Sequence, residues 1–123
     1  MSTGSTIIRR TFRFEAAHRL PNVREGHKCA RLHGHSYHVT VAVTGDVDPH
    51  MGWILDFADI DESWKPLHAI LDHRYLNEIP GLENPTAETI AEFIFRRLVL
   101  PAGKLHSITV HETCTSEVTY SEG

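Results

Sequence analysis

Alternating apolar and polar positions predict two β-strands in the first third of the chain. The first strand, residues 7–18, is apolar at every second position except Arg10, and the second, residues 33–45, has one apolar face and one face of mostly Ser, Thr and His. The apolar positions are Ile8, Phe12, Phe14, Ala16, Tyr37, Val39, Val41 and Val43. Because successive side chains of a strand point to opposite faces, each strand should bury one face and leave the other open.

Two segments with helical spacing follow. Apolar residues from 57 to 71 recur on one face, and Asp56 precedes them, where a carboxylate suits the positive end of the helix dipole. Pro66 lies inside this segment, so we expect it to kink or split the helix. A second helix should begin after Thr86, the expected N-cap, and end before Pro101. Its apolar stripe is Ile90, Phe93, Ile94 and Leu98.

A short strand pair, residues 106–112 and 117–121, should complete the chain. The predicted order is ββααββ, which describes an α+β domain with an antiparallel four-stranded sheet and two helices on one face. A chain of 123 residues holds one such domain, so we expect residues 1–123 to fold as a unit. A small open sheet has exposed edges, and these favour association with a second subunit.

Composition narrows the range of partners. The formal net charge is −4 and no run of Lys or Arg is present, which argues against nucleic acid and against a membrane surface. No apolar stretch reaches the roughly 20 residues that span a bilayer. The polar start, residues 1–6, lacks the apolar centre of a signal peptide, and two cysteines are too few for a disulfide framework. A cytoplasmic protein is the expectation.

Ten histidines are the unusual feature of the composition, and three of them have informative positions. His33 and His35 point to the same side of the second strand, with Gly34 between them leaving room for close approach. His18 ends the first strand on its apolar side. If the strands pair, three imidazoles converge, and three His ligands without a fourth protein ligand are typical of an open catalytic zinc site. Iron or another transition metal fits the same ligands, and plain surface or hydrogen-bonded histidines are the simpler alternative.

Cys29 lies four residues before His33, in a stretch that reads as a loop. A thiol close to Lys28, His27 and a metal has a depressed pKa and is a ready proton acceptor at neutral pH. The simpler alternative is a small buried apolar residue, which is common for free cysteine. Cys114 fits that alternative better.

Two further sites carry acid–base groups. In Asp72–His73 the carboxylate can fix the tautomer of an imidazole that relays a proton, although a solvated helix end explains the pair equally well. Glu112 shares its parity with Ile108 and Val110, so it should face the apolar side of its strand. A carboxylate there requires donors, and a ligand edge with two adjacent N–H groups would supply them. A strand-end Glu that reaches solvent is the alternative.

Taken together, these segments resemble the 6-pyruvoyl-tetrahydropterin synthase family. The resemblance spans Thr11 to Tyr120, and its motifs are Phe14–His18, Cys29–His35, Leu71–His73, Asn84–Glu88 and His111–Thr113. The three residues between Cys29 and His33 look like the 6-carboxy-tetrahydropterin synthase branch, which serves the queuosine precursor pathway; the pyruvoyl-forming enzymes typically have a longer gap. The combined pattern is specific, although most of its pieces are not.

The resemblance implies the tunnelling fold, in which subunits associate into barrels, commonly as a hexamer of two trimers with active sites between subunits. It implies conversion of 7,8-dihydroneopterin triphosphate to 6-carboxy-5,6,7,8-tetrahydropterin with release of acetaldehyde and triphosphate. The family's functional residues would be zinc ligands His18, His33 and His35, general base Cys29, proton relay Asp72 and His73, and Glu112, which would anchor the pterin and join the relay. Lys28, Arg31 and the more remote Lys65 are candidates for the triphosphate.

Two rival interpretations stay open at this point. The first is the pyruvoyl-forming synthase, which shares the site and the substrate but ends at another product. The second is a non-catalytic metal-binding module, in which the three histidines only tie two strands together.

Overall fold

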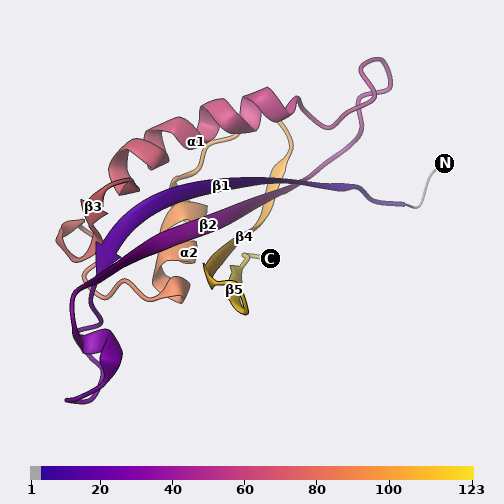
Figure 1. The fold of residues 1–123 in the computed structure, drawn as a ribbon. Coiled ribbons are helices and arrows are strands. Elements are labelled where there is room, and N and C mark those ends of the chain that lie inside the picture. Colours follow the sequence, from indigo (N-terminus) through magenta and orange to yellow (C-terminus); the bar gives the residue numbers. More distant parts are fainter. Residues whose placement is uncertain (1–3) are drawn as a thin grey trace.

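A computed structural model describes residues 4–123 (Figure 1), so residues 1–3 of the expected domain and of its polar start lie outside the described part. The regular elements are β1 (Ile7–His18), β2 (His33–Thr44), α1 (Phe57–Leu71), β3 (Arg74–Tyr75), α2 (Ala87–Arg97), β4 (Lys104–Thr113) and β5 (Ser116–Tyr120). Two 3₁₀ turns, η1 (Lys28–Ala30) and η2 (Leu76–Glu78), lie in the connections. The predicted α+β class is confirmed.

The sheet has five strands in the order β3-β1-β2-β4-β5, which corrects the predicted four-stranded antiparallel sheet. The four long strands do pair antiparallel, but β3 adds a parallel edge beside Ala16 and Ala17. A strand of only two residues has no periodicity to detect. It forms because His73, at a φ of 57°, turns the chain sharply after α1 and returns it along β1.

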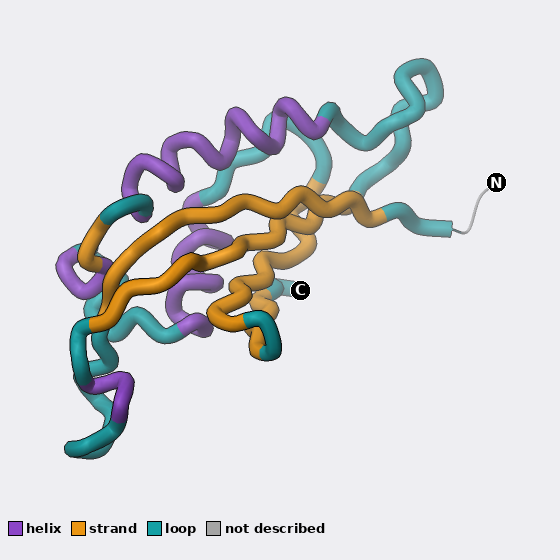
Figure 2. Tube along the Cα trace, in the orientation of Figure 1, coloured by secondary structure: helices purple, strands orange, loops and turns teal. Residues whose placement is uncertain are grey.

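Both helices cover one face of the sheet, as predicted. The buried cluster joins the inward positions of the strands to the apolar stripes of both helices, for example Phe14 and Val39 with Ile60 and Ile90. α1 follows the course of β1, whereas α2 packs on β4 and β5 (Figure 2). Burying these stripes contributes most of the stability of such a fold. The opposite face of the sheet stays open and polar.

Both helices begin at the N-terminal residues predicted from the sequence. The Asp56 carboxylate accepts a hydrogen bond from the backbone N–H of Ala58 at 3.0 Å, and Thr86 Oγ1 accepts one from Thr89 N–H at 3.2 Å. Each bond satisfies a donor in the first turn that has no partner within the helix. α1 runs across Pro66 as one helix, so the possible split does not occur. None of the helices in residues 4–123 combines the length and the apolar character needed to cross a membrane.

Candidate metal centre

Three imidazoles meet where β1 ends and β2 begins. The antiparallel register sets His18 directly opposite His33 and places His35 opposite Ala16. The Nε2 atom of His18 lies 3.0 Å from Nε2 of His33 and 3.2 Å from Nε2 of His35. Among the described residues this histidine triad is the one group of three or more His, Cys, Asp or Glu side chains whose ligand atoms lie close enough to share a metal ion. The predicted convergence is confirmed.

Backbone carbonyls orient the rings of the histidine triad. His18 Nδ1 lies 2.9 Å from the carbonyl oxygen of Pro85, and His33 Nδ1 lies 2.8 Å from that of Arg31. His35 Nδ1 makes a longer contact of 3.4 Å with the carbonyl of the next residue. A carbonyl can only accept, so each Nδ1 carries the proton and each neutral ring presents an Nε2 lone pair. Hydrogen bonds of this kind position metal-ligating histidines.

Three lone pairs that face one another form a site suited to a cation. Zinc holds imidazole nitrogens at about 2.0–2.1 Å, which separates two tetrahedral ligands by roughly 3.3 Å, close to the spacing found here. His18 is buried, and this burial is the main cause that lowers its pKa; His33 and His35 lower it further, while the Pro85 and Glu112 contacts oppose the shift. The neutral, ligand-competent ring is thereby favoured at neutral pH. The residues present fit zinc.

Glu112 lies beside the histidine triad. Its Oε1 atom is 3.5 Å from Nε2 of His18 and 3.6 Å from Nε2 of His35. The predicted parity holds, since Ile108 and Val110 of the same strand are fully buried on that side. A carboxylate next to nitrogen lone pairs adds negative charge to the site and strengthens its demand for a cation. Glu112 is about one-third exposed, at 34%, and lines a second cavity together with Ser36, His38 and His111, called the Glu112 cavity below.

Asp72 and His73 form a fixed pair at the end of α1. Asp72 Oδ2 lies 2.7 Å from Nδ1 of His73, and Asp72 Oδ1 accepts a hydrogen bond from the backbone N–H of Glu15 at 2.9 Å. The backbone N–H of His73 donates to the Glu15 carbonyl at 2.6 Å. The Glu15 bond and the His73 ring together lower the pKa of Asp72. The pair is therefore an ionised carboxylate that orients an exposed imidazole, and it is attached to β1.

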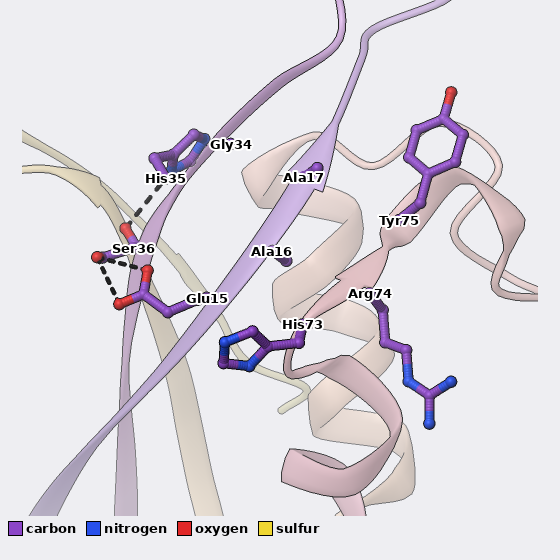
Figure 3. Close-up of a pocket in the computed structure, with 9 residues that line it drawn as sticks. All are labelled: Glu15, Ala16, Ala17, Gly34, His35, Ser36, His73, Arg74 and Tyr75. Carbon is purple, nitrogen blue, oxygen red and sulfur yellow. Dashed lines mark hydrogen bonds between the residues drawn. The ribbon is translucent and has the colours of Figure 1, made fainter.

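A cavity of about 570 Å³, called the His35 cavity below, is lined by His73 of this pair and by His35 of the histidine triad (Figure 3). His73 lies on one side and His35 on the other, and the ring of His73 is turned toward β1. Glu15 and Ser36 line the wall between them, joined by hydrogen bonds of 2.7 and 2.9 Å. Glu15 was not selected from its position in the sequence, because it points to the open face of β1. Its anchoring role depends on α1 ending beside β1.

Tyr37 was also missed as a polar group. Its parity predicted a buried side chain, and it is fully buried, but its hydroxyl has no hydrogen-bond partner among the described residues. The ring lies 4.2 Å from the His35 ring and 5.6 Å from the His18 ring, measured between centroids. A Tyr in an otherwise apolar strand pattern is the only signal that the sequence contained.

Cys29 lies in η1, in the loop between β1 and β2. Its backbone carbonyl accepts a hydrogen bond from Leu20 N–H at 2.8 Å, and its side chain is half-buried. The sulfur is not part of the group of ligand atoms, and Cys29 lines neither the His35 cavity nor the Glu112 cavity. Its role as a base next to the metal remains a prediction.

The basic candidates for the triphosphate are equally untested. None of the three lines either cavity, and Lys65 Nζ pairs with Glu62 at 2.6 Å on the exposed side of α1. Arg31 contributes its backbone carbonyl to the orientation of His33.

The fold and the histidine triad define an α+β domain with a group of ligand atoms that could hold a metal ion, and comparison with known proteins identifies its family. The model of the 6-pyruvoyl tetrahydropterin synthase family matches residues 7–123. The chain therefore belongs to the 6-pyruvoyl tetrahydropterin synthase family, which makes it an enzyme of pterin chemistry and confirms the resemblance.

Relatives of both branches are similar to the chain. A 6-carboxy-5,6,7,8-tetrahydropterin synthase of Synechocystis is 47% identical over 121 residues, which cover 93% of this chain and 92% of that protein. The human 6-pyruvoyl tetrahydrobiopterin synthase is 33% identical over 129 residues, covering 92% and 89%. The solved structure of the Caenorhabditis elegans 6-pyruvoyl tetrahydropterin synthase superposes with a TM-score of 0.88 at 27% identity and covers 98% of this chain and 97% of that one. The tunnelling fold is confirmed by this likeness.

Proposed function

We propose that the chain is a zinc-dependent 6-carboxy-5,6,7,8-tetrahydropterin synthase. The reaction takes 7,8-dihydroneopterin triphosphate and water to 6-carboxy-5,6,7,8-tetrahydropterin, acetaldehyde and triphosphate, as a carbon–carbon lyase step toward queuosine. The observation that carries the proposal is the meeting of three Nε2 lone pairs, 3.0 and 3.2 Å apart, at the end of a cavity that also contains His73. The 47% identity to a relative named for this activity supports the choice of branch.

His18, His33 and His35 hold the zinc ion in this proposal. Bound zinc supplies a Lewis acid that stabilises negative charge developing on the oxygens of the substrate side chain. The carbonyls behind the rings keep each Nε2 in the ligand form. The Nε2 atoms of His33 and His35 already lie 3.0 and 3.2 Å from Nε2 of His18.

The remaining residues bind the ring and move protons. Glu112 accepts hydrogen bonds from the pterin edge, because its carboxylate lies beside His18 and His35 and is about one-third exposed, at 34%. Asp72 holds the proton of His73 on Nδ1, which leaves Nε2 of His73 free to take up or return a proton. Cys29 is the general base that removes a carbon-bound proton. Since a single chain leaves Cys29 outside both cavities, we propose that a neighbouring subunit completes the constellation.

Association as a homohexamer, a dimer of trimers, belongs to the same proposal. The sheet ends in β3 and β5, and each of these edge strands pairs with a neighbour on one side only. Unpaired strand edges are suited to pairing with another chain. We propose a cytoplasmic enzyme whose partners are its own copies and a small pterin triphosphate.

The pyruvoyl-forming reaction is the second candidate. It is favoured by the human relative and by the likeness to the Caenorhabditis elegans structure. Both reactions begin with the same substrate and release triphosphate, but only the carboxy branch releases acetaldehyde.

Product analysis separates these candidates. Purified protein is incubated with 7,8-dihydroneopterin triphosphate, and the pterin mass and acetaldehyde are measured with and without a zinc chelator. We expect 6-carboxy-tetrahydropterin and acetaldehyde in equal amounts, and neither after chelation. A pyruvoyl product without acetaldehyde would establish the second candidate. Turnover that survives complete removal of metal would exclude both zinc mechanisms.

A further inference from the structure

The hydroxyl of Tyr37 is a buried donor without an acceptor. The residue is 0% exposed, and its oxygen is the one buried side-chain N or O atom in residues 4–123 that lacks a hydrogen bond. The ring is held by stacking on Phe14, with centroids 4.8 Å apart, and by the rings of His18 and His35. An unpaired buried hydroxyl destabilises the fold, so a position that retains one needs a reason.

Glu112 has the complementary deficiency. The hydrogen bonds found in residues 4–123 include none that its carboxylate accepts from a backbone N–H, an amide or a hydroxyl; its contacts are the Nε2 atoms of His18 and His35. Those nitrogens are lone-pair atoms in the tautomer that the backbone carbonyls select. Once they bind a cation they cannot donate to Glu112 at all. Among the described residues, the carboxylate then has no N–H or O–H donor, and its exposed third faces solvent.

The register of the sheet brings the backbones of Tyr37 and Glu112 close together. The β2–β4 ladder runs to Val39 opposite Val110 and His38 opposite His111. Tyr37 and Glu112 are the next residues of the two strands beyond this last pair, and both have the parity of the inward face. Directly opposite residues in an antiparallel pair have Cβ atoms about 4.5–5.5 Å apart. A phenol hydroxyl ordinarily carries its proton at neutral pH, so Tyr37 can act as the donor.

We propose that Tyr37 is a positioning residue for Glu112: when a divalent cation binds the histidine triad, the Tyr37 hydroxyl donates a hydrogen bond to the Glu112 carboxylate and holds it in place. Each of the two unpaired groups then has a partner, and the carboxylate is oriented without using a ligand nitrogen. Tyr37 itself touches neither substrate nor metal. The role of the oriented carboxylate toward a pterin rests on the proposed function, whereas the hydrogen bond does not.

Tyr37→Phe tests the proposal, because it removes only the oxygen and keeps the ring that packs on Phe14. The purified protein is stripped of metal, then titrated with zinc against a coloured chelator, and its thermal unfolding is followed with and without zinc. Without metal, we expect the variant to be at least as stable as the wild type. With zinc, we expect a smaller rise in Tm and about tenfold weaker zinc binding, as for loss of a hydrogen bond to a charged group.

Two controls assign the effect to Glu112. Tyr120→Phe removes a hydroxyl that contacts Arg96 and Glu122, at the Ile108 end of β4, away from Glu112. It should change stability equally with and without zinc. In a Glu112→Ala background, Tyr37→Phe should no longer alter zinc affinity. Equal zinc affinity of wild type and Tyr37→Phe would overturn the proposal, and so would a difference that persists without Glu112.

Steady-state kinetics connect the bond to the pterin. If Glu112 anchors the ring, Tyr37→Phe should raise KM for 7,8-dihydroneopterin triphosphate more than it lowers kcat. A fall in kcat alone would contradict positioning of a substrate anchor. The two proposals fail separately: a wild type without pterin turnover refutes the proposed function, while the zinc titration still decides whether Tyr37 and Glu112 are coupled.

Discussion

At the scale of single residues, the candidate centre depends on which atom of each side chain already has a partner. Backbone carbonyls accept hydrogen bonds from Nδ1 of His18 and His33, so the Nε2 atoms are left for a ligand. Asp72 likewise accepts a hydrogen bond from Nδ1 of His73. Each ring therefore has one committed and one free nitrogen, which is the arrangement that metal binding and proton transfer both need.

Asp72→Asn should weaken the fold in a pH-dependent way. The folded protein holds the pKa of Asp72 below its ordinary value, chiefly through the Glu15 N–H and next through His73. The ionised carboxylate therefore stabilises the fold above the unfolded pKa of about 3.9, and this contribution is lost as the pH falls toward the folded pKa. Denaturant unfolding at pH 7 should show the variant to be less stable, with a gap that narrows below pH 4. A constant gap would contradict the assignment.

Cys29→Ala should give a folded, zinc-containing and inactive protein. Removal of a half-buried thiol from a loop changes packing little, whereas loss of a general base typically lowers the rate about 10²–10⁴-fold. Zinc content, Tm and turnover are measured on the same preparation. Normal turnover in a variant that retains zinc would refute Cys29 as the base.

At the scale of elements, the residues of the candidate centre come from the ends of strands and helices rather than from their middles. β1 ends and β2 begins at the histidine triad, and the segment that leads into α2 supplies the Pro85 carbonyl behind His18. The end of α1 delivers Asp72 to the edge of β1. Strand and helix ends carry groups that regular structure leaves unpaired, so they are suited to hold a site.

Thr86→Ala should destabilise α2. Thr86 Oγ1 accepts the N–H of Thr89, and without it this donor loses its partner in the first turn. The expected loss is about 1 kcal/mol in the free energy of unfolding. Thr86→Ser keeps the oxygen and serves as the matched control, with stability close to wild type. Equal destabilisation by Ala and Ser would show that the methyl group, not the cap, matters.

At the scale of the whole molecule, the apolar core and the metal centre are separate structures that share one sheet. The buried apolar cluster extends over both helices and the four long strands, and none of the three histidines belongs to it. The core therefore has the means to hold the fold without a metal ion. This arrangement argues against the non-catalytic module, in which the histidines tie the strands together.

Chelation of zinc should lower Tm without unfolding the domain. A ligand that binds only the folded state adds about 2.7 kcal/mol when its free concentration is a hundredfold above Kd, and removing it costs the same amount. Far-UV circular dichroism at 25 °C should be unchanged after chelation, while the thermal midpoint falls. Cooperative loss of secondary structure on chelation would instead support a structural metal site.

Periodicity was sufficient to predict both helices and the four longer strands. α1 has its predicted bounds, β1 has its predicted bounds, and β2 ends one residue earlier than expected. β4 and β5 were predicted as 106–112 and 117–121 and occupy Lys104–Thr113 and Ser116–Tyr120. The inward positions of the strands were predicted for the same reason, and with them the side to which His18, His33 and His35 point. All of these follow from the spacing of neighbours along one chain segment.

The sequence by itself determined the α+β class, the buried faces and the convergence of three histidines, because each is encoded in local spacing. Only the tertiary structure decided the parallel strand β3, the Pro85 carbonyl that orients His18 from 67 positions away, and the unpaired Tyr37 hydroxyl opposite Glu112. These depend on which distant atoms meet after packing. A periodic pattern tells which face a side chain occupies, but not which hydrogen-bonding groups remain without a partner there.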